Sequence, residues 1–297
     1  MPDPASRPVR LMALMNQKGG VGKTTTTVNL AAAFAKAGRS TLVVDLDPQA
    51  HATLHLGVDP NALTGSVYDV LIDEEADVGS LIHQTRDNLG LLPSQTDLAA
   101  VETELANAPD RQRRLERALA KLQGRYEFIL LDCPPSLGLL TLNGLAAARE
   151  VLIPMQAHFL ALQGVGKLLE TVSLMSKAAN PRLRVTGVVL CMHDTSSTHT
   201  REVVADLDSF FEAAREKDSP WRFARVLRPP VRRNIKLAEG PSFGQTIFEY
   251  APTATGAEDY ARLADVLLRE WDAMLAKREP EPAPEVHVVG AAPRVGA

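Results

Sequence analysis

The sequence predicts an α/β fold: a doubly wound, mostly parallel sheet flanked by helices. Two observations predict it. Apolar runs of strand length recur along the chain, and stretches with helical periodicity separate them. The runs are rich in Val, Leu and Ile and barely alternate with polar residues, as expected for strands that helices cover on both faces. The predicted strands are, in order, 10–15, 41–45, 89–92, 128–132, 150–154, 185–192 and 225–227.

Helical patterns fall between these strands, and the stretch VNLAAAFAKAG after the first strand is a good helix former. The predicted helices are 25–37, 97–104, 111–123, 140–148, 166–178, 201–214 and 257–277. We find no internal repeat and no linker within residues 9–277, which predicts one domain there. Residues 1–8 are expected to be a flexible N-terminus, and the Pro/Ala-rich stretch 278–297 a disordered tail.

Composition limits the classes of function. The 297 residues carry a formal net charge of −4, which argues against a wholly basic DNA-coating protein but allows a local basic patch. There is no signal peptide core and no apolar run that approaches a membrane span, so a cytoplasmic location is expected. Cys133 and Cys191 lack metal-ligand spacing, and small buried side chains are the expected explanation for both.

A glycine-rich loop directly follows the first predicted strand, where residues 16–27 read NQKGGVGKTTTT. It is related to the phosphate-binding pattern G-x-x-x-x-G-K-[ST], in which glycines let backbone N–H groups turn around a polyphosphate. Lys23 would hold the β- and γ-phosphates, and the Thr24 hydroxyl would bind Mg²⁺. A turn with a chance lysine is the alternative. The predicted nucleotide-binding residues are Lys18, Gly19, Gly20, Val21, Gly22, Lys23, Thr24 and Thr25.

Carboxylates end two further strands, where a doubly wound sheet places its ligands. TLVVDLDPQ carries Asp45 and Asp47, and FILLDCPPS carries Asp132. Alone, each aspartate could simply cap a helix or a turn. With the phosphate loop upstream, Asp132 is expected to hold the hydration shell of Mg²⁺ opposite Thr24, and the sequence predicts a Mg²⁺–nucleotide site.

These segments carry a family resemblance. KGGVGKTTT, DLDPQ and LLDCPPSLGLLTLNGL resemble the deviant Walker A, Walker A′ and Walker B segments of the ParA/Soj/MinD partition ATPases, a branch of the P-loop NTPases. RRNIKLAEGPSFGQTIFEY and GAEDYARLA resemble the C-terminal signature of the ParA/Soj branch. The resemblance extends over about residues 9–272.

The resemblance implies an ATPase that forms an ATP-bound sandwich dimer, with Lys18, Lys23 and Asp47 as catalytic residues. Lys18 would reach across to the partner's nucleotide, and Asp47 would position the attacking water. Thr24, Asp47 and Asp132 would form the Mg²⁺ site. A cation supplied in trans is physically reasonable because the transition state spreads charge over the phosphoryl oxygens. Otherwise Lys18 is a solvated surface lysine.

The same resemblance implies that the dimer binds DNA nonspecifically and that a ParB-like or cargo adaptor protein stimulates slow hydrolysis and release. The outcome would be segregation of a chromosome or plasmid, or positioning of a protein cargo, by a nucleoid-associated protein. The sequence departs from the family in two places. DPQ is followed by Ala50-His51-Ala52 instead of the common Gly-Asn-Ala, and we expect His51 to be an exposed loop residue. Ser196 stands where an arginine is customary, so that DNA contact would be missing or moved to Arg201.

A basic segment is the candidate DNA surface. Residues 222–240 contain one acid, Glu239, and six cations: Arg222, Arg225, Arg228, Arg232, Arg233 and Lys236. Such a cluster can neutralise phosphates without reading bases, although a solvated face or internal ion pairs would explain it too. The resemblance favours Arg233 and Lys236 as contacts, with Arg228, Arg232 and Arg201 as further candidates. A second group, Arg111, Arg113, Arg114 and Arg117, lies with Asp110 and Glu116 on what we interpret as an exposed helix of mixed charge.

Two other functions share this fold. A MinD-like membrane-cycling ATPase needs a terminal amphipathic helix with a basic polar face. The stripe in 258–277 has a mixed polar face that includes Asp265, Glu270 and Asp272, so we expect it to pack on the core without stable membrane association. A metabolic or redox enzyme is the other alternative, and an iron–sulfur version would need an exposed cysteine pair.

Overall fold

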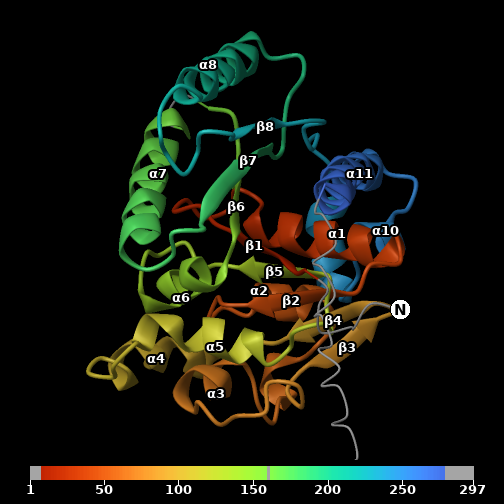
Figure 1. Cartoon of the computed structure of the whole chain (residues 1–297). Helices are drawn as coiled ribbons and strands as arrows, with labels where there is room; N and C mark the ends of the chain where they lie inside the picture. The colour runs from red at the N-terminus through yellow and green to blue at the C-terminus, as the bar shows by residue number, and fades with distance from the viewer. Residues whose placement is uncertain (1–7, 159–160, 278–297) are drawn as a thin grey trace, which may run out of the picture.

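An eight-stranded sheet in the order β3-β4-β2-β5-β1-β6-β7-β8 is the centre of the computed structural model, which describes residues 8–158 and 161–277 (Figure 1). Neighbouring strands are parallel except β3 and β4, which are antiparallel. The predicted fold class is confirmed. The strands are β1 (Arg10–Leu14), β2 (Thr41–Asp45), β3 (His83–Arg86), β4 (Leu89–Leu92), β5 (Phe128–Asp132), β6 (Glu150–Met155), β7 (Arg184–Leu190) and β8 (Arg225–Leu227).

Helices cover both faces of this sheet and divide the core in two. One cluster of buried side chains lies between the sheet and helices α1 and α11, and the other between the sheet and α3, α5, α6, α7 and α8 (Figure 1). The α-helices are α1 (Lys23–Lys36), α2 (His51–His55), α3 (Val67–Ile72), α4 (Val101–Glu104), α5 (Arg114–Ala120), α6 (Leu139–Ala147), α7 (Ala161–Ala178), α8 (Thr198–Ala214), α9 (Lys236–Glu239), α10 (Ile247–Tyr250) and α11 (Thr255–Ala276). Turns of 3₁₀ helix are η2 (Pro60–Ala62), η3 (Thr96–Ala100), η4 (Arg111–Arg113) and η5 (Gly240–Phe243).

Some boundaries differ from the prediction for local reasons. α1 begins at Lys23 and not at residue 25, because the left-handed backbone of Gly22 (φ 94°) starts the helix there. α8 begins at Thr198 and not at residue 201, since the Ser197 side chain accepts a hydrogen bond from the backbone N–H of Thr200. The prediction of single helices over 97–104 and 111–123 was wrong in detail, because each begins with a 3₁₀ turn, and the second ends as an α-helix at Ala120.

The sequence predicts no strand at β3, and this omission has a physical cause. The side chains of β3 are exposed or half-buried, so the segment lacks the apolar run that marks the other strands. A turn that includes Asn88, with its positive φ of 58°, brings β3 back against β4 at the sheet edge. An edge strand pairs with one neighbour only and exposes its other edge to solvent, so its side chains can be polar.

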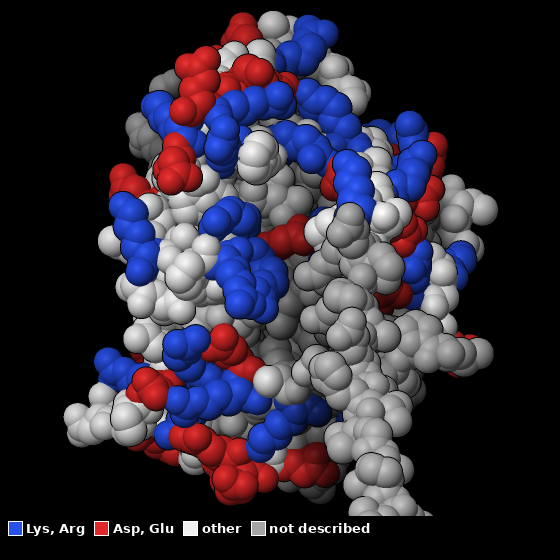
Figure 2. Space-filling model, viewed as in Figure 1, with Lys and Arg blue, Asp and Glu red and all other residues white. Residues whose placement is uncertain are grey.

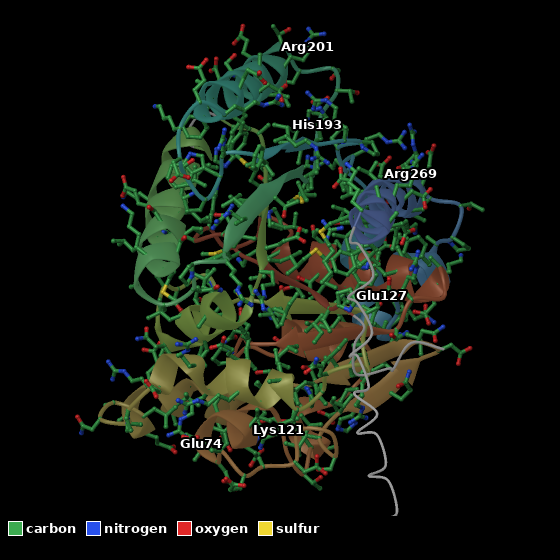
Figure 3. All side chains as sticks on the ribbon, viewed as in Figure 1. Glu74, Lys121, Glu127, His193, Arg201 and Arg269 are labelled. Atoms are coloured by element: carbon green, nitrogen blue, oxygen red, sulfur yellow. The ribbon has the colours of Figure 1, made fainter. Side chains whose placement is uncertain are left out.

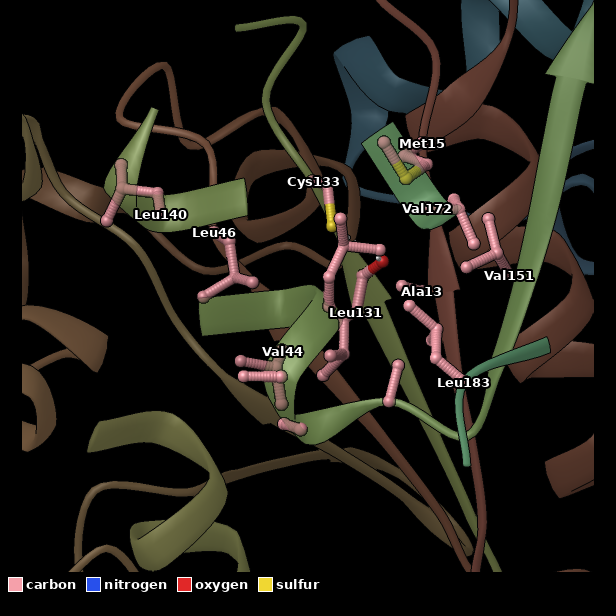
Figure 4. Packing of buried hydrophobic residues seen from close by; sticks show 14 of the residues in the cluster. Ala13, Met15, Val44, Leu46, Leu131, Cys133, Leu140, Val151, Val172 and Leu183 are labelled. Carbon is pink, nitrogen blue, oxygen red and sulfur yellow. Dashed lines mark hydrogen bonds between the residues drawn. The ribbon is translucent and has the colours of Figure 1, made fainter. Parts of the chain in front are cut away.

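Figure 4 shows part of the larger of the two core clusters, including side chains from β1 (Ala13), β2 (Val44) and β5 (Leu131). Cys133 lies in it beside Leu46 and Leu131, and Cys191 belongs to the other cluster. Both thiols are buried, and burial raises the pKa of each, that of Cys191 to about 11. The expectation of small buried cysteines is confirmed.

Helix α11 packs on the core, as expected from its mixed polar face. Leu263, Leu267 and Trp271 of its apolar stripe are buried, and the guanidinium of Arg10 donates a hydrogen bond of 2.6 Å to the Leu267 carbonyl. Within the described ranges, none of the helices is long and apolar enough to cross a membrane. The predicted flexible N-terminus, residues 1–8, lies outside the described residues except for Pro8, and the predicted disordered tail 278–297 lies outside them entirely.

Strand β8 depends on a glycine in its neighbour β7. A Cβ atom at Gly187 would overlap the backbone carbonyl oxygen of Arg225, which faces it across the sheet. Gly187→Ala should therefore destabilise the protein by about 2 kcal/mol, the range of overpacked cores, as measured by urea unfolding. Gly164→Ala is the matched control, because a Cβ there meets open space. Since alanine is the better helix former, this change in α7 should raise the free energy of unfolding by up to about 1 kcal/mol. Equal stability of the two variants would contradict this account.

Candidate functional site

The phosphate loop joins β1 to α1 at the carboxyl edge of the sheet. Asn16 fixes its start: the side-chain amide donates to the Pro154 carbonyl of β6 at 2.8 Å, and its oxygen accepts the Lys18 N–H at 3.0 Å. Gly20 (φ 70°) and Gly22 (φ 94°) have left-handed backbones, which other residues adopt at a cost. The loop therefore has the backbone turns that a phosphate cradle needs.

Lys23 lies within the loop with 8% of its surface exposed. Its ammonium donates a hydrogen bond of 3.2 Å to the Lys18 carbonyl. Burial lowers its pKa, while the nearby carboxylates Asp132 and Asp47 oppose that shift. A buried cation that points back across its own loop is well placed for a phosphate.

Asp132 is the buried anchor of the site at the end of β5. Its two carboxylate oxygens accept the hydroxyls of Thr24 at 2.7 Å and Thr27 at 2.8 Å, both from α1. Burial raises its pKa to about 6, although the threonine hydroxyls and Lys23 oppose the shift. Its register partner on β2 is Asp45, whose pKa burial raises to about 7, and the charge of Asp132 adds to that rise. The end of the sheet thus holds two close acids.

Asp47 lies just beyond β2 and borders the cleft. One carboxylate oxygen accepts the Gln49 N–H at 3.0 Å. The turn continues through Ala50, which has a left-handed backbone (φ 53°). For an alanine this conformation costs about 1 kcal/mol. His51 follows as the exposed first residue of α2, as expected.

The donors at this edge fit Mg²⁺. The Thr24 hydroxyl and the carboxylates of Asp47 and Asp132 are hard oxygen ligands, the kind that Mg²⁺ prefers, and Mg²⁺ normally takes phosphate oxygens and water as well. The direct bond between Thr24 and Asp132 brings two of these groups together. When bound, the ion would neutralise charge on the phosphates.

A cleft of about 1150 Å³ leads away from the loop, and no local pattern in the sequence predicts the residues at its far end. That end is lined mainly by the late segment, including Asn234, Leu237, Pro241 and Phe243. The two walls approach each other at Gly57 and Gly244, where a Cβ on Gly244 would lie 2.7 Å from the Gly57 Cα. The run RRNIKLAEGPSFG contains these lining residues, but its two arginines suggest a DNA-binding segment and not the wall of a nucleotide pocket.

The basic segment is mostly ion-paired. Arg225 pairs with Glu270, Arg228 with Asp208 at 2.7 Å, Arg232 with Asp259 at 2.6 Å and Glu258 at 2.8 Å, and Lys236 with Glu239 at 2.8 Å. Arg222 donates to the Arg215 carbonyl. These contacts favour the ion-pair alternative for most of the cluster, and above all for Arg232, whose partner Asp259 is buried.

Arg233 differs from its neighbours: it is exposed, and among the described residues no acid pairs with its side chain. Figure 2 shows Lys and Arg side chains gathered below α8. Arg201 lies exposed on α8 at the top of the molecule, while Glu74, which pairs with Arg114 and Arg117 of the second basic group, lies with Lys121 at the opposite end (Figure 3). That second group forms pairs with Glu74, Asp110 and Glu116, as expected for a mixed-charge surface.

Comparisons with known proteins agree with this site. A family model described as an AAA domain matches residues 9–185. The chromosome partitioning protein ParA of Myxococcus xanthus is 41% identical over 88% of each chain. The chromosome-partitioning ATPase Soj of Thermus thermophilus is 43% identical over 88% of this chain and 96% of its own. The chain belongs to the ParA/Soj family of partition ATPases.

A solved structure shows what the family site can hold. A Mycobacterium smegmatis protein named cobyrinic acid a,c-diamide synthase, with bound ATP analog and magnesium, is 38% identical to this partition ATPase. Its TM-score is 0.75 over 90% of this chain and 97% of its own. The ParA/Soj-family protein described here is accordingly an ATPase that uses ATP and Mg²⁺.

The two buried acids make stability depend on pH. Their pKa values in the folded protein, about 7 and about 6, exceed the ordinary value of 3.8, so folding favours their protonated forms. Without nucleotide or Mg²⁺, the stability they contribute should be complete below about pH 4 and lost as the pH rises to about 7. Asp132→Asn should make the free energy of unfolding fall less steeply as the pH rises, as measured by urea unfolding in the presence of a chelator. Asp87→Asn, an exposed turn acid, is the control, and equal slopes for both variants would contradict the prediction.

Proposed function

We propose that the ATPase works as an ATP-bound sandwich dimer that binds DNA nonspecifically and is released when a partner stimulates hydrolysis. Residues 9–277 act as one ATPase domain. The partner is a ParB-like or cargo adaptor protein, and the protein acts in the cytoplasm on nucleoid DNA. The names of its relatives support chromosome partitioning, and plasmid or protein cargo would use the same cycle.

The observation that carries the dimer is the position of Lys18. This lysine is exposed and is not among the residues lining its own cleft. Its ammonium lies 2.7 Å from the Nε2 of His158, beyond β6. A lysine that precedes the buried phosphate lysine in the same loop but faces outward can serve a nucleotide bound to a second protomer. Lys23 and Asp47 then act within each protomer, with Thr24, Asp47 and Asp132 holding Mg²⁺.

Lys18→Ala should keep ATP binding but lower turnover about 100-fold or more, because a cation supplied in trans stabilises the transferring phosphoryl group. A mixing experiment tests the geometry. Asp47→Ala protomers still provide Lys18, so mixing them with Lys18→Ala protomers should restore part of the ATPase rate. Lys121→Ala, a surface lysine at the far end, should have no effect. Failure of the mixture to recover any activity would refute action in trans.

The ion pairs of the basic segment, residues 222–240, indicate which of its side chains can bind DNA. Exposed pairs contribute at most about 1 kcal/mol, so Lys236 and Arg228 can exchange their acids for DNA phosphates at small cost. Arg232 is bonded to the buried Asp259 and is better explained as structural. Among residues 8–158 and 161–277, no acid would have to release Arg233, and Arg201 donates only to the Thr198 hydroxyl. We therefore place the principal contacts at Arg233 and Lys236, with Arg201 and Arg228 beside them.

Arg233→Ala should weaken ATP-dependent DNA binding about tenfold and reduce the dependence of log affinity on log salt by about one ion, since one phosphate contact is lost. Fluorescence anisotropy with duplexes of unrelated sequence, over a salt series, measures both. The control is Arg269→Ala, which removes an equal charge from α11, where the side chain bonds to the Asp265 carbonyl. Binding that is indifferent to ATP, or equal loss in both variants, would overturn the proposal.

A second candidate, an ATP-dependent synthase, has one observation in its favour: the name of the Mycobacterium smegmatis relative. ATP turnover that rises with cobyrinic acid and not with DNA would support it. The membrane-cycling and redox alternatives lack such support, because the α11 stripe is packed and both cysteines are buried.

A further inference from the structure

The turn that carries Asp47 rests on a buried polar frame of three residues from different elements. We call Asp45 at the end of β2, Thr53 in α2 and Ser94 after β4 the Asp47 frame. All three are fully buried. They come together only because β2 pairs with β4 and α2 packs beneath the turn. Buried polar residues normally need such partners, but these partners converge on one candidate catalytic residue.

The hydrogen bonds of the frame form a closed ring through the backbone of Asp47. Asp45 accepts the Asp47 N–H at 3.1 Å with one oxygen, and the Thr53 N–H at 2.9 Å and hydroxyl at 2.8 Å with the other. The Thr53 hydroxyl accepts the Ser94 N–H at 2.9 Å. The Ser94 hydroxyl donates to the Asp47 carbonyl at 2.7 Å, closing the ring. Both backbone groups of Asp47 are therefore fixed.

The fixed backbone matters because the Asp47 side chain has few contacts of its own, among the described residues, that would orient it. Within the described part of the chain, the one hydrogen bond to its carboxylate comes from the neighbouring Gln49 N–H, and the side chain borders the open cleft. Misplacing a reacting group by about 1 Å can cost about 100-fold in rate. The orientation of the carboxylate thus depends on the conformation of the Asp47 backbone. The hydrogen bonds of the Asp47 frame hold that backbone in place.

The frame also sets Asp47 relative to the phosphate loop. The strand ends of β2 and β5 are in register at Asp45 and Asp132, and the Leu46 N–H donates to the Asp132 carbonyl at 2.9 Å. Asp132 in turn holds Thr24 of the loop. A short, rigid path of bonds therefore connects the loop, through Asp132 and Leu46, to the Asp47 turn.

We propose that Ser94 and Thr53 are positioning residues for ATP hydrolysis, which hold the Asp47 backbone so that its carboxylate faces the nucleotide. This rests on the proposed role of Asp47. Neither residue touches the cleft, so their loss changes turnover and leaves nucleotide affinity intact. A residue that only stabilises the fold would show the reverse pattern: a lower melting temperature with normal turnover of the folded protein.

The test compares Ser94→Ala and Thr53→Val with Thr53→Ser, which keeps the hydroxyl. Phosphate release by the full chain at saturating Mg-ATP gives kcat, and titration with a fluorescent ATP analogue gives Kd. Ser94→Ala and Thr53→Val should lower kcat about tenfold or more, with Kd within about twofold, and Thr53→Ser should restore kcat. Thr41→Val is the control: this buried threonine at the other end of β2 donates to the Arg39 carbonyl and should leave kcat unchanged.

A double-mutant cycle decides whether Ser94 acts through Asp47. In an Asp47→Ala background, Ser94→Ala should cause no further fall in kcat, because the group it positions is gone. A full further tenfold fall, or normal kcat in Ser94→Ala alone, would overturn the inference. Normal kcat in Asp47→Ala alone would instead refute the proposed role of Asp47, so the two failures are distinguishable. Melting curves of every variant confirm that the compared proteins are folded.

Discussion

The attachment of α1 to Asp132 is the interaction on which the site depends. A single buried carboxylate at the end of β5 accepts hydroxyls from Thr24 and Thr27, and so fixes the first turn of α1 against the sheet. The phosphate loop spans the short gap between β1 and that turn. Because β1 and β2 both pair with β5 in parallel register, the same anchor also fixes how far the Asp47 turn lies from the loop.

Charge explains why this site suits a metal-bound polyphosphate. Two acids lie close together at the sheet edge, and burial raises the pKa of both, so the protein alone does not fully offset their charge. Lys23 is the nearby cation, but burial lowers its pKa. Mg²⁺ adds the missing positive charge beside the carboxylates, and the phosphates match Lys23 and the loop N–H groups. Ligand and site therefore complete each other electrostatically.

One late segment connects the two surfaces of the proposed cycle. Asn234 lines the far end of the cleft, while the side chain of its neighbour Arg233 is exposed to solvent. The same segment is fixed to the loop after β7 by the paired backbones of His193 and Arg232. A change in the cleft wall would therefore move the basic side chain directly, without a long path. This short connection is a physical basis for the proposed dependence of DNA binding on nucleotide.

The sequence by itself determined the fold class, the phosphate loop and the acids Asp47 and Asp132. These features are local: glycines, strand runs and the residues that follow them are read within a few positions. Only the tertiary structure decided the polar strand β3, the lining of the cleft by Phe243, and which arginines are paired. It also decided the Asp47 frame, in which Ser94 is bonded to a residue 47 positions away. Such contacts join segments that become neighbours only when the strands pair in their final order. No local sequence pattern shows which distant residue each of these side chains will contact.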